Sequence, residues 1–261
     1  MPLPTAYSNV AGELKSMSFT LENVVPWGRS FDEYVAMFAL SDADLRGRIL
    51  GCGDGPASFN ASLARRGGRV VSVDPLYLFS AEDVRNRIRQ TYDNVMEQTW
   101  KNSHEFVWTS IKTVDELGQV RMAAMEEFLL DYPLGMEQGR YVVGELPYLP
   151  FADRRFDLAV CSHLLFLYSK QLSADFHLES IQELCRVAGE VRIFPLLELG
   201  ARTSRHLQTV SAGLSAQAYA VTIIPVSYEF QRGGNQMMRV KKRLKAVGLY
   251  NRRDSKNRQL K

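Results

Sequence analysis

Cysteine is scarce in this sequence, and the few that occur form no motif. The chain of 261 residues has three cysteines, at positions 52, 161 and 185. Their odd number and scattered spacing indicate free thiols in a reducing compartment rather than disulfides or a metal site. No apolar run approaches the roughly 18 residues of a membrane span, and no secretory signal pattern opens the chain. We therefore expect a cytoplasmic protein with no membrane partner and no bound metal.

Acidic residues are almost absent from the last part of the chain. From Arg239 to Lys261, ten lysines and arginines stand against one acid, Asp254, so this segment carries +9 within a chain of net charge +3. Such a segment can contact RNA, although it is more often a solvated, mobile terminus. Tyr250 is its one aromatic residue, so no ladder for stacking bases accompanies the charge. We assign residues 241–261 as a basic tail.

The most informative stretch runs from Arg48 to Tyr77. It reads as a short buried strand, a glycine turn at positions 51, 53 and 55, a helix over residues 57–68, and a second strand that ends at Asp74. Glycine allows backbone angles closed to other residues and lets a ligand approach the main chain. Pro56 suits the first turn of a helix. Asp74 stands where an open α/β sheet places the acid that binds ribose hydroxyls, so the stretch predicts a nucleoside-binding βαβ unit.

The glycine spacing selects among nucleoside ligands. A dinucleotide fingerprint would require glycine at position 56, which is Pro56, and no P-loop lysine follows the turn. NAD-dependent oxidoreduction is therefore disfavoured. The pattern G-x-G-x-G, followed by an acid at the end of the next strand, resembles motifs I and II of the class I S-adenosylmethionine-dependent methyltransferases.

The second half of the chain carries the same resemblance. Gly144-Glu145 follows a strand expected over residues 140–143, and residues 149–160 resemble the family's Leu-Pro-Phe and Phe-Asp-apolar-apolar segments. By that match Glu145 would accept a hydrogen bond from the adenine amino group, and Leu146 would present its backbone to the ring. The residues after the fourth strand would border the site, because ligands bind at the carboxyl ends of such strands. The resemblance covers about residues 45–78 and 140–240.

The resemblance implies the fold and most of the cofactor contacts. The fold expected is α/β: a Rossmann-like, doubly wound, mostly parallel seven-stranded sheet closed by a C-terminal β-hairpin around residues 231–235. S-adenosylmethionine is the expected cofactor, with S-adenosylhomocysteine as product. The residues expected to bind it are Gly51, Cys52, Gly53, Asp54, Gly55, Asp74, Pro75, Glu145, Leu146, Ser162 and Arg29. The family's usual acid two residues before the first glycine is here Ile49, a loss for which Asp54 or Arg29 would compensate.

The expected S-adenosylmethionine-binding domain spans residues 45–240 and contains one insertion. Apolar residues recur at helical spacing through residues 80–137, which predicts two or three helices after the second strand. These helices would form a cap that shields methyl transfer from water and shapes the acceptor pocket. The alternative is that they form the interface of a homodimer.

Residues 1–44 are expected to form an N-terminal segment and a helix over the cofactor site. Ser30 can N-cap that helix, with Glu33 completing a capping box. In methyltransferases of this class an N-terminal helix often lies across the cofactor, so Trp27, Arg29 and Tyr34 would face the site. The alternative is that Trp27 and Tyr34 only pack the helix onto the sheet.

The sequence indicates fewer of the residues that contact the acceptor than of those that contact the cofactor. His163 is the best candidate for a catalytic base, because it would follow the fourth strand and histidine titrates near neutrality. The alternative is a histidine that orients the loop. Tyr168 and Glu198 are weaker candidates. Arg232, in the expected hairpin turn, could bind an acceptor carboxylate, and we group Trp27, Tyr34, Tyr168 and Arg232 as substrate-binding.

Two motifs that are absent from the sequence narrow the range of possible methyl-transfer reactions. No Asn/Asp-Pro-Pro-aromatic run follows the fourth strand, as in enzymes that methylate exocyclic base amines, and no Pro-Cys nucleophile appears, as cytosine C5 enzymes need. The sequence thus predicts a methyltransferase with a helical cap that acts on a small or medium-sized acceptor. One alternative is an RNA methyltransferase that uses the basic tail. Another is a protein that binds S-adenosylmethionine without transferring its methyl group.

Overall fold

A computed structural model describes residues 25–243 of the chain. Most of the expected N-terminal segment (residues 1–24) and the main part of the expected basic tail (residues 244–261) lie outside the described residues. The described part includes the whole of residues 45–240, the expected nucleoside-binding domain.

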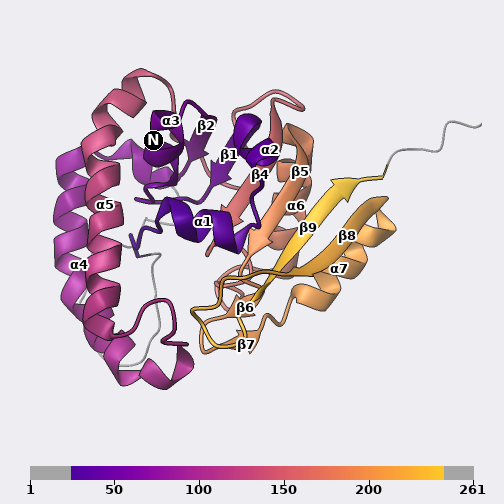
Figure 1. Ribbon diagram of the computed structural model, residues 1–261. Helices are drawn as coiled ribbons and strands as arrows, with labels where there is room; N and C mark the ends of the chain where they lie inside the picture. The colour runs from indigo at the N-terminus through magenta and orange to yellow at the C-terminus, as the bar shows by residue number, and fades with distance from the viewer. Residues whose placement is uncertain (1–24, 244–261) are drawn as a thin grey trace, which may run out of the picture.

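A seven-stranded, mostly parallel sheet forms the centre of the molecule, as the sequence predicts (Figure 1). Its order is β3-β2-β1-β4-β5-β9-β8, in which the first five strands run parallel and β9 runs antiparallel to both of its neighbours, β5 and β8. The strands are β1 Arg48–Cys52, β2 Arg69–Val73, β3 Tyr141–Val142, β4 Phe156–Ser162, β5 Ala188–Phe194, β8 Tyr219–Pro225 and β9 Gln236–Lys242. The hairpin β8–β9 closes the sheet beside β5, which confirms the predicted fold class.

Helices cover both faces of the sheet, because its central strands are apolar on both sides. They are α1 Phe31–Met37, α2 Asp42–Arg46, α3 Phe59–Arg65, α4 Ala81–Lys101, α5 Val114–Glu137, α6 Ala174–Val187 and α7 Leu207–Ala216, with 3₁₀ turns η1 Pro75–Leu78 and η2 Ser103–Glu105. Residues of α6 and α7 pack on one face of the sheet, and those of α1 and α3 pack on the other. A separate apolar cluster joins α4 and α5 to η1 and β3.

The insertion consists of two long helices that lie side by side along one edge of the molecule (Figure 1). Ser80 caps α4 in a reciprocal capping box with Asp83, and the Thr113 side chain caps α5. Such caps satisfy backbone N–H groups that a helix start leaves unpaired. Helix α5 packs on α3 and β3, and α4 packs on α5.

Some local predictions were wrong. Pro56 precedes the helix instead of opening it, because α3 begins at Phe59 and Ser58 is its N-cap residue. Strand β9 runs to Lys242, two residues into the segment assigned to the tail, and Lys241 pairs with Glu190 of β5 at 2.5 Å. Sequence patterns also gave no sign of α2, nor of the small antiparallel pair β6 Leu197–Glu198 and β7 Arg202–Thr203.

Candidate functional site

The candidate site lies at the carboxyl edge of the sheet, where the strand order reverses. From β1 the chain crosses to β2 on one side, and β4 pairs with β1 on the other. Open α/β sheets bind ligands in the crevice outside such a point. A cavity of about 360 Å³ opens here, lined by the glycine turn, the segment before α1, the residues after β4 and β5, the facing ends of α4 and α5, and the loop between β8 and β9.

The glycine turn requires its glycines for two different reasons. Gly53 and Gly55 have φ values of +69° and +52°, in the left-handed region that favours glycine. A Cβ at Gly55 would meet nothing within 4 Å, so the backbone there is open to a ligand. At Gly51 the reason is packing, because a Cβ would lie 1.8 Å from Oδ2 of Asp54. The Asp54 side chain thus folds back over Gly51 and fixes the turn.

Asp54 links the turn to α1 and to β2. Its carboxylate accepts hydrogen bonds from the Tyr34 hydroxyl at 2.8 Å and from the Ser72 hydroxyl at 2.6 Å. Burial raises the pKa of Asp54 to about 7, with a further contribution from the charge of Asp74, although the two hydroxyl hydrogen bonds act in the opposite direction. Asp54 therefore titrates near neutral pH within the wall of the cavity.

Asp74 follows β2 and faces the same turn. Its Oδ2 accepts from the Gly55 backbone N–H at 2.8 Å, and its Oδ1 accepts from the Leu76 N–H at 2.8 Å. The Tyr77 hydroxyl donates to the Gly55 carbonyl at 2.9 Å. The turn after β1 and the turn after β2 are therefore held against each other.

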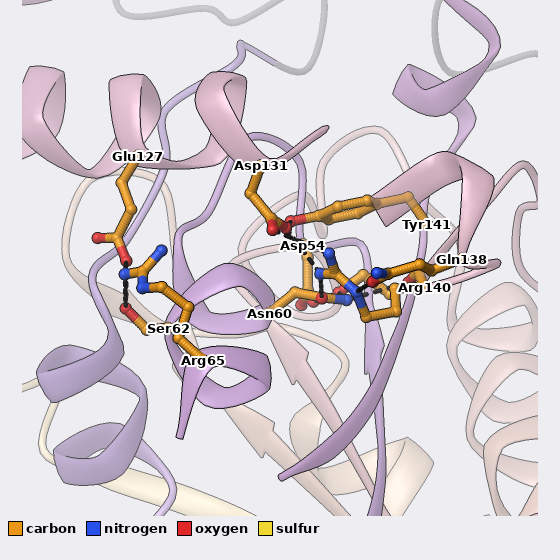
Figure 2. Close-up of polar contacts among 10 residues, drawn as sticks. Asp54, Asn60, Ser62, Arg65, Glu127, Asp131, Gln138, Arg140 and Tyr141 are labelled. Atoms are coloured by element: carbon orange, nitrogen blue, oxygen red, sulfur yellow. Dashed lines mark hydrogen bonds and ion pairs between the residues drawn. The ribbon is translucent and has the colours of Figure 1, made fainter. Parts of the chain in front are cut away.

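A polar network behind the glycine turn joins it to the inserted helix α5 (Figure 2). Asp131 of α5 pairs with both terminal nitrogens of Arg140, at 2.7 and 2.8 Å. Arg140 Nη1 also donates to the Asn60 side-chain oxygen at 2.7 Å, and the Asn60 amide donates to the Ser72 hydroxyl at 3.1 Å. The Ser72 hydroxyl then donates to Asp54, so one chain of hydrogen bonds runs from α5 to the turn.

Asn60 of that network belongs to α3, and a second contact between α5 and α3 lies beside it. Figure 2 shows Ser62 and Arg65 of α3 directed toward Glu127 of α5, and both bond to its carboxylate. The inserted helix therefore docks on the helix that follows the glycine turn through two separate polar groups.

Arg29 lies in the cavity wall without a carboxylate partner among residues 25–243. Its Nη1 donates to the Trp27 carbonyl at 2.6 Å, and its buried Nε has no hydrogen-bond partner within those residues. Burial, and then the nearby charge of Arg121, lowers the pKa of Arg29. A buried guanidinium with an unpaired N–H fits an anionic ligand group, since guanidinium binds carboxylates with two parallel hydrogen bonds.

The wall beside Arg29 is built around a buried ion pair. Arg121 of α5 binds the Glu33 carboxylate of α1 through both terminal nitrogens, at 2.5 and 2.7 Å, and the Tyr228 hydroxyl donates to Glu33 at 2.8 Å. Burial alone would raise the pKa of Glu33, but the charge and hydrogen bonds of Arg121 lower it to about 2. Three elements that border the cavity meet at this carboxylate.

His163 follows β4 and lines the cavity. Its Nδ1 lies 2.8 Å from the Ser162 hydroxyl, and its backbone N–H donates to the Phe194 carbonyl at 2.7 Å. Its φ of +55° places it in the left-handed region, which non-glycine residues adopt rarely and often at functional sites. Burial, and then the charges of Arg29 and Arg121, holds the pKa of His163 well below its usual range. The imidazole is therefore neutral at pH 7.

Sequence reasoning missed a group of charged residues at the other side of the cavity. Lys170 follows β4, and Arg202 and Arg205 follow the short strand β6; all three line the cavity with Glu198. Only Glu198 was considered from the sequence, as a base, but its carboxylate binds Arg205 at 2.8 Å and Arg202 at 3.3 Å. No motif marks these residues, because the turn that gathers them is defined by two strands of two residues each.

The structure brings most of the predicted site residues to this cavity, but not all. Those that line it are Trp27, Arg29, Tyr34, Gly53, Asp54, Gly55, Asp74, Ser162, His163 and Tyr168. Gly51, Cys52, Pro75, Glu145 and Leu146 do not. Gly51 and Cys52 belong to β1, and Leu146 is buried in the core beside the half-buried Glu145.

Arg232 is placed differently from the prediction. It is exposed and does not line the cavity, and its guanidinium donates to the backbone carbonyls of His104 and Phe106, at 3.2 and 3.1 Å. It thus joins the loop between β8 and β9 to the segment between α4 and α5. In the structure its role is to hold two loops together.

Within residues 25–243 no group of three or more His, Cys, Asp or Glu side chains could hold a metal ion. The same part of the chain contains no helix long and apolar enough to span a membrane. The three cysteines are buried and free, as expected.

No family model matches this chain. The chain does match an uncharacterized protein of Methanocaldococcus jannaschii, MJ0045, with 32% identity over 224 residues. The match covers 85% of this chain and 98% of the relative. The chain belongs to the MJ0045 family.

Several solved structures resemble this member of the MJ0045 family in fold. Magnesium protoporphyrin IX methyltransferase from Synechocystis PCC 6803, with bound S-adenosylmethionine, is 12% identical, with a TM-score of 0.43 over 81% of this chain and 77% of that one. A TehB-like S-adenosylmethionine-dependent methyltransferase from Corynebacterium glutamicum is 13% identical, with a TM-score of 0.41 over 85% and 90%. A putative RNA methyltransferase from Pyrococcus horikoshii, PH1948, is 12% identical, with a TM-score of 0.38 over 82% and 81%.

Proposed function

We propose that this chain is an S-adenosylmethionine-dependent methyltransferase that acts on a small or medium-sized acceptor. The observation that carries the proposal is that the glycine turn, Asp74, Arg29 and His163 all border one cavity at the switch point of the sheet. Ligands of open α/β sheets bind at this place. The volume of about 360 Å³ also falls in the range of small-molecule pockets.

The residues present fit the cofactor. The open backbone at Gly55 can lie against a nucleoside, and Asp74 lines the cavity at the end of β2, where open α/β sheets place the acid that binds ribose hydroxyls. The unpaired Nε of Arg29 suits the carboxylate of the methionine portion. Glu145 and Leu146 follow β3 beside the end of β2 but do not line the cavity, so the adenine would have to extend beyond the lining residues to contact them.

When bound, S-adenosylmethionine supplies a methyl group that is already activated on its sulfonium. The chain's own residues then have to orient an acceptor and exclude water. Helices α4 and α5 line the cavity with Val95, Thr99 and Leu117, in keeping with the proposed cap. Trp27, Tyr34 and Tyr168 would contact the acceptor. His163, neutral at pH 7, would take a proton from an acceptor that must lose one.

Calorimetric titration with S-adenosylmethionine, S-adenosylhomocysteine and NAD tests the cofactor assignment. We expect the first two to bind with micromolar affinity and NAD not to bind. The Asp74→Ala variant should bind S-adenosylhomocysteine at least tenfold more weakly, a loss of about 1.4 kcal/mol. Asp153→Ala is the matched control and should bind normally. Asp153 is far from Asp74 in the sequence, and its side chain, which is 77% exposed, forms an ion pair with Arg186.

Failure of folded, ligand-free protein to bind either sulfur nucleoside would overturn the proposal. Turnover separates an enzyme from a protein that only binds the cofactor. We expect S-adenosylhomocysteine to accumulate when the protein is supplied with S-adenosylmethionine and a cell extract as the source of acceptor. Its absence with every extract tried, together with normal binding, would favour the non-catalytic alternative.

A further inference from the structure

The cavity has a positively charged side that the proposed methyltransferase function leaves unused. Lys170, Arg202 and Arg205 line it together, from the segments that follow β4 and β5. The glycine turn follows β1, and Asp74 follows β2, on the other side of the switch point. The acids of the cofactor side and the cations of this side are therefore separated across the cavity.

A single carboxylate orients the two arginines. Glu198, only 6% exposed, binds Arg205 through Nε and Nη2, at 2.8 and 3.1 Å, and Arg202 through Nη2 at 3.3 Å. One carboxylate against two guanidiniums leaves a positive charge. Lys170 adds another, since no carboxylate pairs with it in the described part of the chain. Both arginine side chains remain at least half exposed, so they can still donate hydrogen bonds to a ligand.

The segment that carries these arginines is fastened to the loop after β4. The Ser204 N–H donates to the Leu196 carbonyl at 3.0 Å, and the Leu199 N–H donates to the Leu167 carbonyl at 3.2 Å. The buried hydroxyls of Ser169 and Ser204 are 2.6 Å apart. Groups held in this way lose little freedom on binding, which is the condition for a preorganised anion site.

The walls between the two sides are largely apolar. Phe106 and Phe230 stack with their ring centroids 4.9 Å apart, and both line the cavity. Other apolar lining residues are Val95, Leu117, Leu167, Phe194 and Leu199. Glu105 is the one acid that the insertion places in this lining.

We propose that the methyl acceptor is an organic anion, with an apolar, ring-containing body and a carboxylate or phosphate group that binds Arg202, Arg205 and Lys170. Arginine forks match both groups, and the apolar walls can contact the ring-containing body. That the anion is a methyl acceptor rests on the proposed function, whereas the anion site itself stands on the geometry above.

Calorimetric titrations with matched probes test this site, in the presence of saturating S-adenosylhomocysteine and without it. The probes are 2-naphthoate, 2-naphthyl phosphate and the neutral 2-naphthamide. We expect at least one of the two anions to bind at least tenfold more tightly than the amide. The anion that binds more tightly shows whether the site prefers a carboxylate or a phosphate. Arg205→Gln and, separately, Lys170→Gln should each reduce the preference to less than threefold. Lys170 is exposed, so its variant remains informative if the arginine variant does not fold.

Arg46→Gln is the control, because Arg46 is an exposed arginine of α2 at the opposite edge of the sheet. It should keep the full preference. Equal binding of anion and amide to the wild type, or no binding of any probe, would overturn the inference. A loss of preference in the Arg46 variant equal to that in the Arg205 variant would do the same. Failure of S-adenosylhomocysteine to bind overturns the proposed function alone, because the titrations without it still test the anion site.

Discussion

The Arg121 guanidinium and the Glu33 carboxylate form a buried, two-pronged ion pair across 88 positions of sequence, with Nη–O distances of 2.5 and 2.7 Å. The pair joins α5 of the insertion to α1, and the Tyr228 hydroxyl adds the loop between β8 and β9. The Arg121 side chain is fully buried. The pair therefore fixes the elements around the cavity relative to one another.

We expect Arg121→Met to lower the free energy of unfolding by about 3–5 kcal/mol, because the variant leaves the Glu33 charge buried without its partner. Adding Glu33→Gln to that variant should recover part of the loss by removing the charge. Arg48→Met is the control, since the Arg48–Asp157 pair has side chains 39% and 52% exposed and should contribute far less to stability than the buried pair. Urea unfolding at pH 7 measures all three. Equal losses in the Arg121 and Arg48 variants would contradict the prediction.

Two fully buried serines allow a matched test of the network behind the glycine turn. Ser72 donates to Asp54 and accepts from Asn60, whereas the Ser180 hydroxyl has no partner in the described structure. We expect Ser72→Ala to lower the free energy of unfolding by about 1–3 kcal/mol, because it leaves a buried acceptor and a buried donor unpaired. Ser180→Ala should leave it unchanged or raise it, because the substitution removes a buried hydroxyl that has no hydrogen-bond partner in the described structure. Similar effects of the two substitutions in urea unfolding would show that the network contributes nothing.

The sequence predicted the elements whose signals are local. Alternating and continuous apolar runs mark the strands, the glycine turn and Asp74 mark the first crossover, and Ser30 with Glu33 marks the start of α1 by a capping box that the structure confirms. Each of these signals lies within one element or one crossover of the chain. They suffice for the sheet and for the part of the cavity wall that the glycine turn and Asp74 form.

The rest of the site depends on contacts between distant residues, which composition and spacing do not reveal. Arg121 is one charged residue among many in the insertion, and only the packing of α5 on α3 and α1 buries it. Arg202 and Arg205 become part of the cavity because Glu198 holds them after a turn between very short strands. Arg232 was predicted to bind an anion because it stands in a glycine turn, but its guanidinium donates hydrogen bonds to the backbone carbonyls of another loop.

The titration of Asp54 gives a prediction for stability against pH. Its pKa is raised from 3.8 to about 7 in the folded chain, so the folded state binds more protons than the unfolded state between these values. The contribution of Asp54 to stability is therefore fully present below pH 3.8 and is lost as the pH rises toward 7. Asp54→Asn keeps the shape of the protonated acid and cannot ionise. We expect the free energy of unfolding of this variant, relative to that of the wild type, to increase by at least about 1 kcal/mol from pH 5 to pH 8.

Urea unfolding of wild type, Asp54→Asn and Asp157→Asn at pH 5, 6, 7 and 8 measures this difference. Asp157 is the control because its hydrogen bonds with Arg48 lower its pKa to about 2, so its protonation does not change over that range. The stability difference between wild type and Asp157→Asn should stay constant. A constant difference for Asp54→Asn as well would show that Asp54 remains charged throughout.

His163 gives the prediction that bears most directly on catalysis. If it takes a proton from the acceptor, His163→Gln should lower the rate of S-adenosylhomocysteine release roughly 10²–10⁴-fold and leave the binding of S-adenosylhomocysteine unchanged. Because burial and the charges of Arg29 and Arg121 lower the pKa of His163 well below 6.5, the wild-type rate should already be level at pH 6.5 and above. It should fall only at more acidic pH, and the variant should lose that acid limb.

The matched control is His104→Gln, since His104 is exposed and does not line the cavity. Its rate and pH profile should equal those of the wild type, measured with one preparation of cell extract as the acceptor source. A full rate in the His163 variant would assign that residue to orienting the loop after β4, through the contact between its N–H and the Phe194 carbonyl. An acceptor that reacts through an oxygen already ionised at neutral pH would then be indicated, because such a nucleophile needs no base.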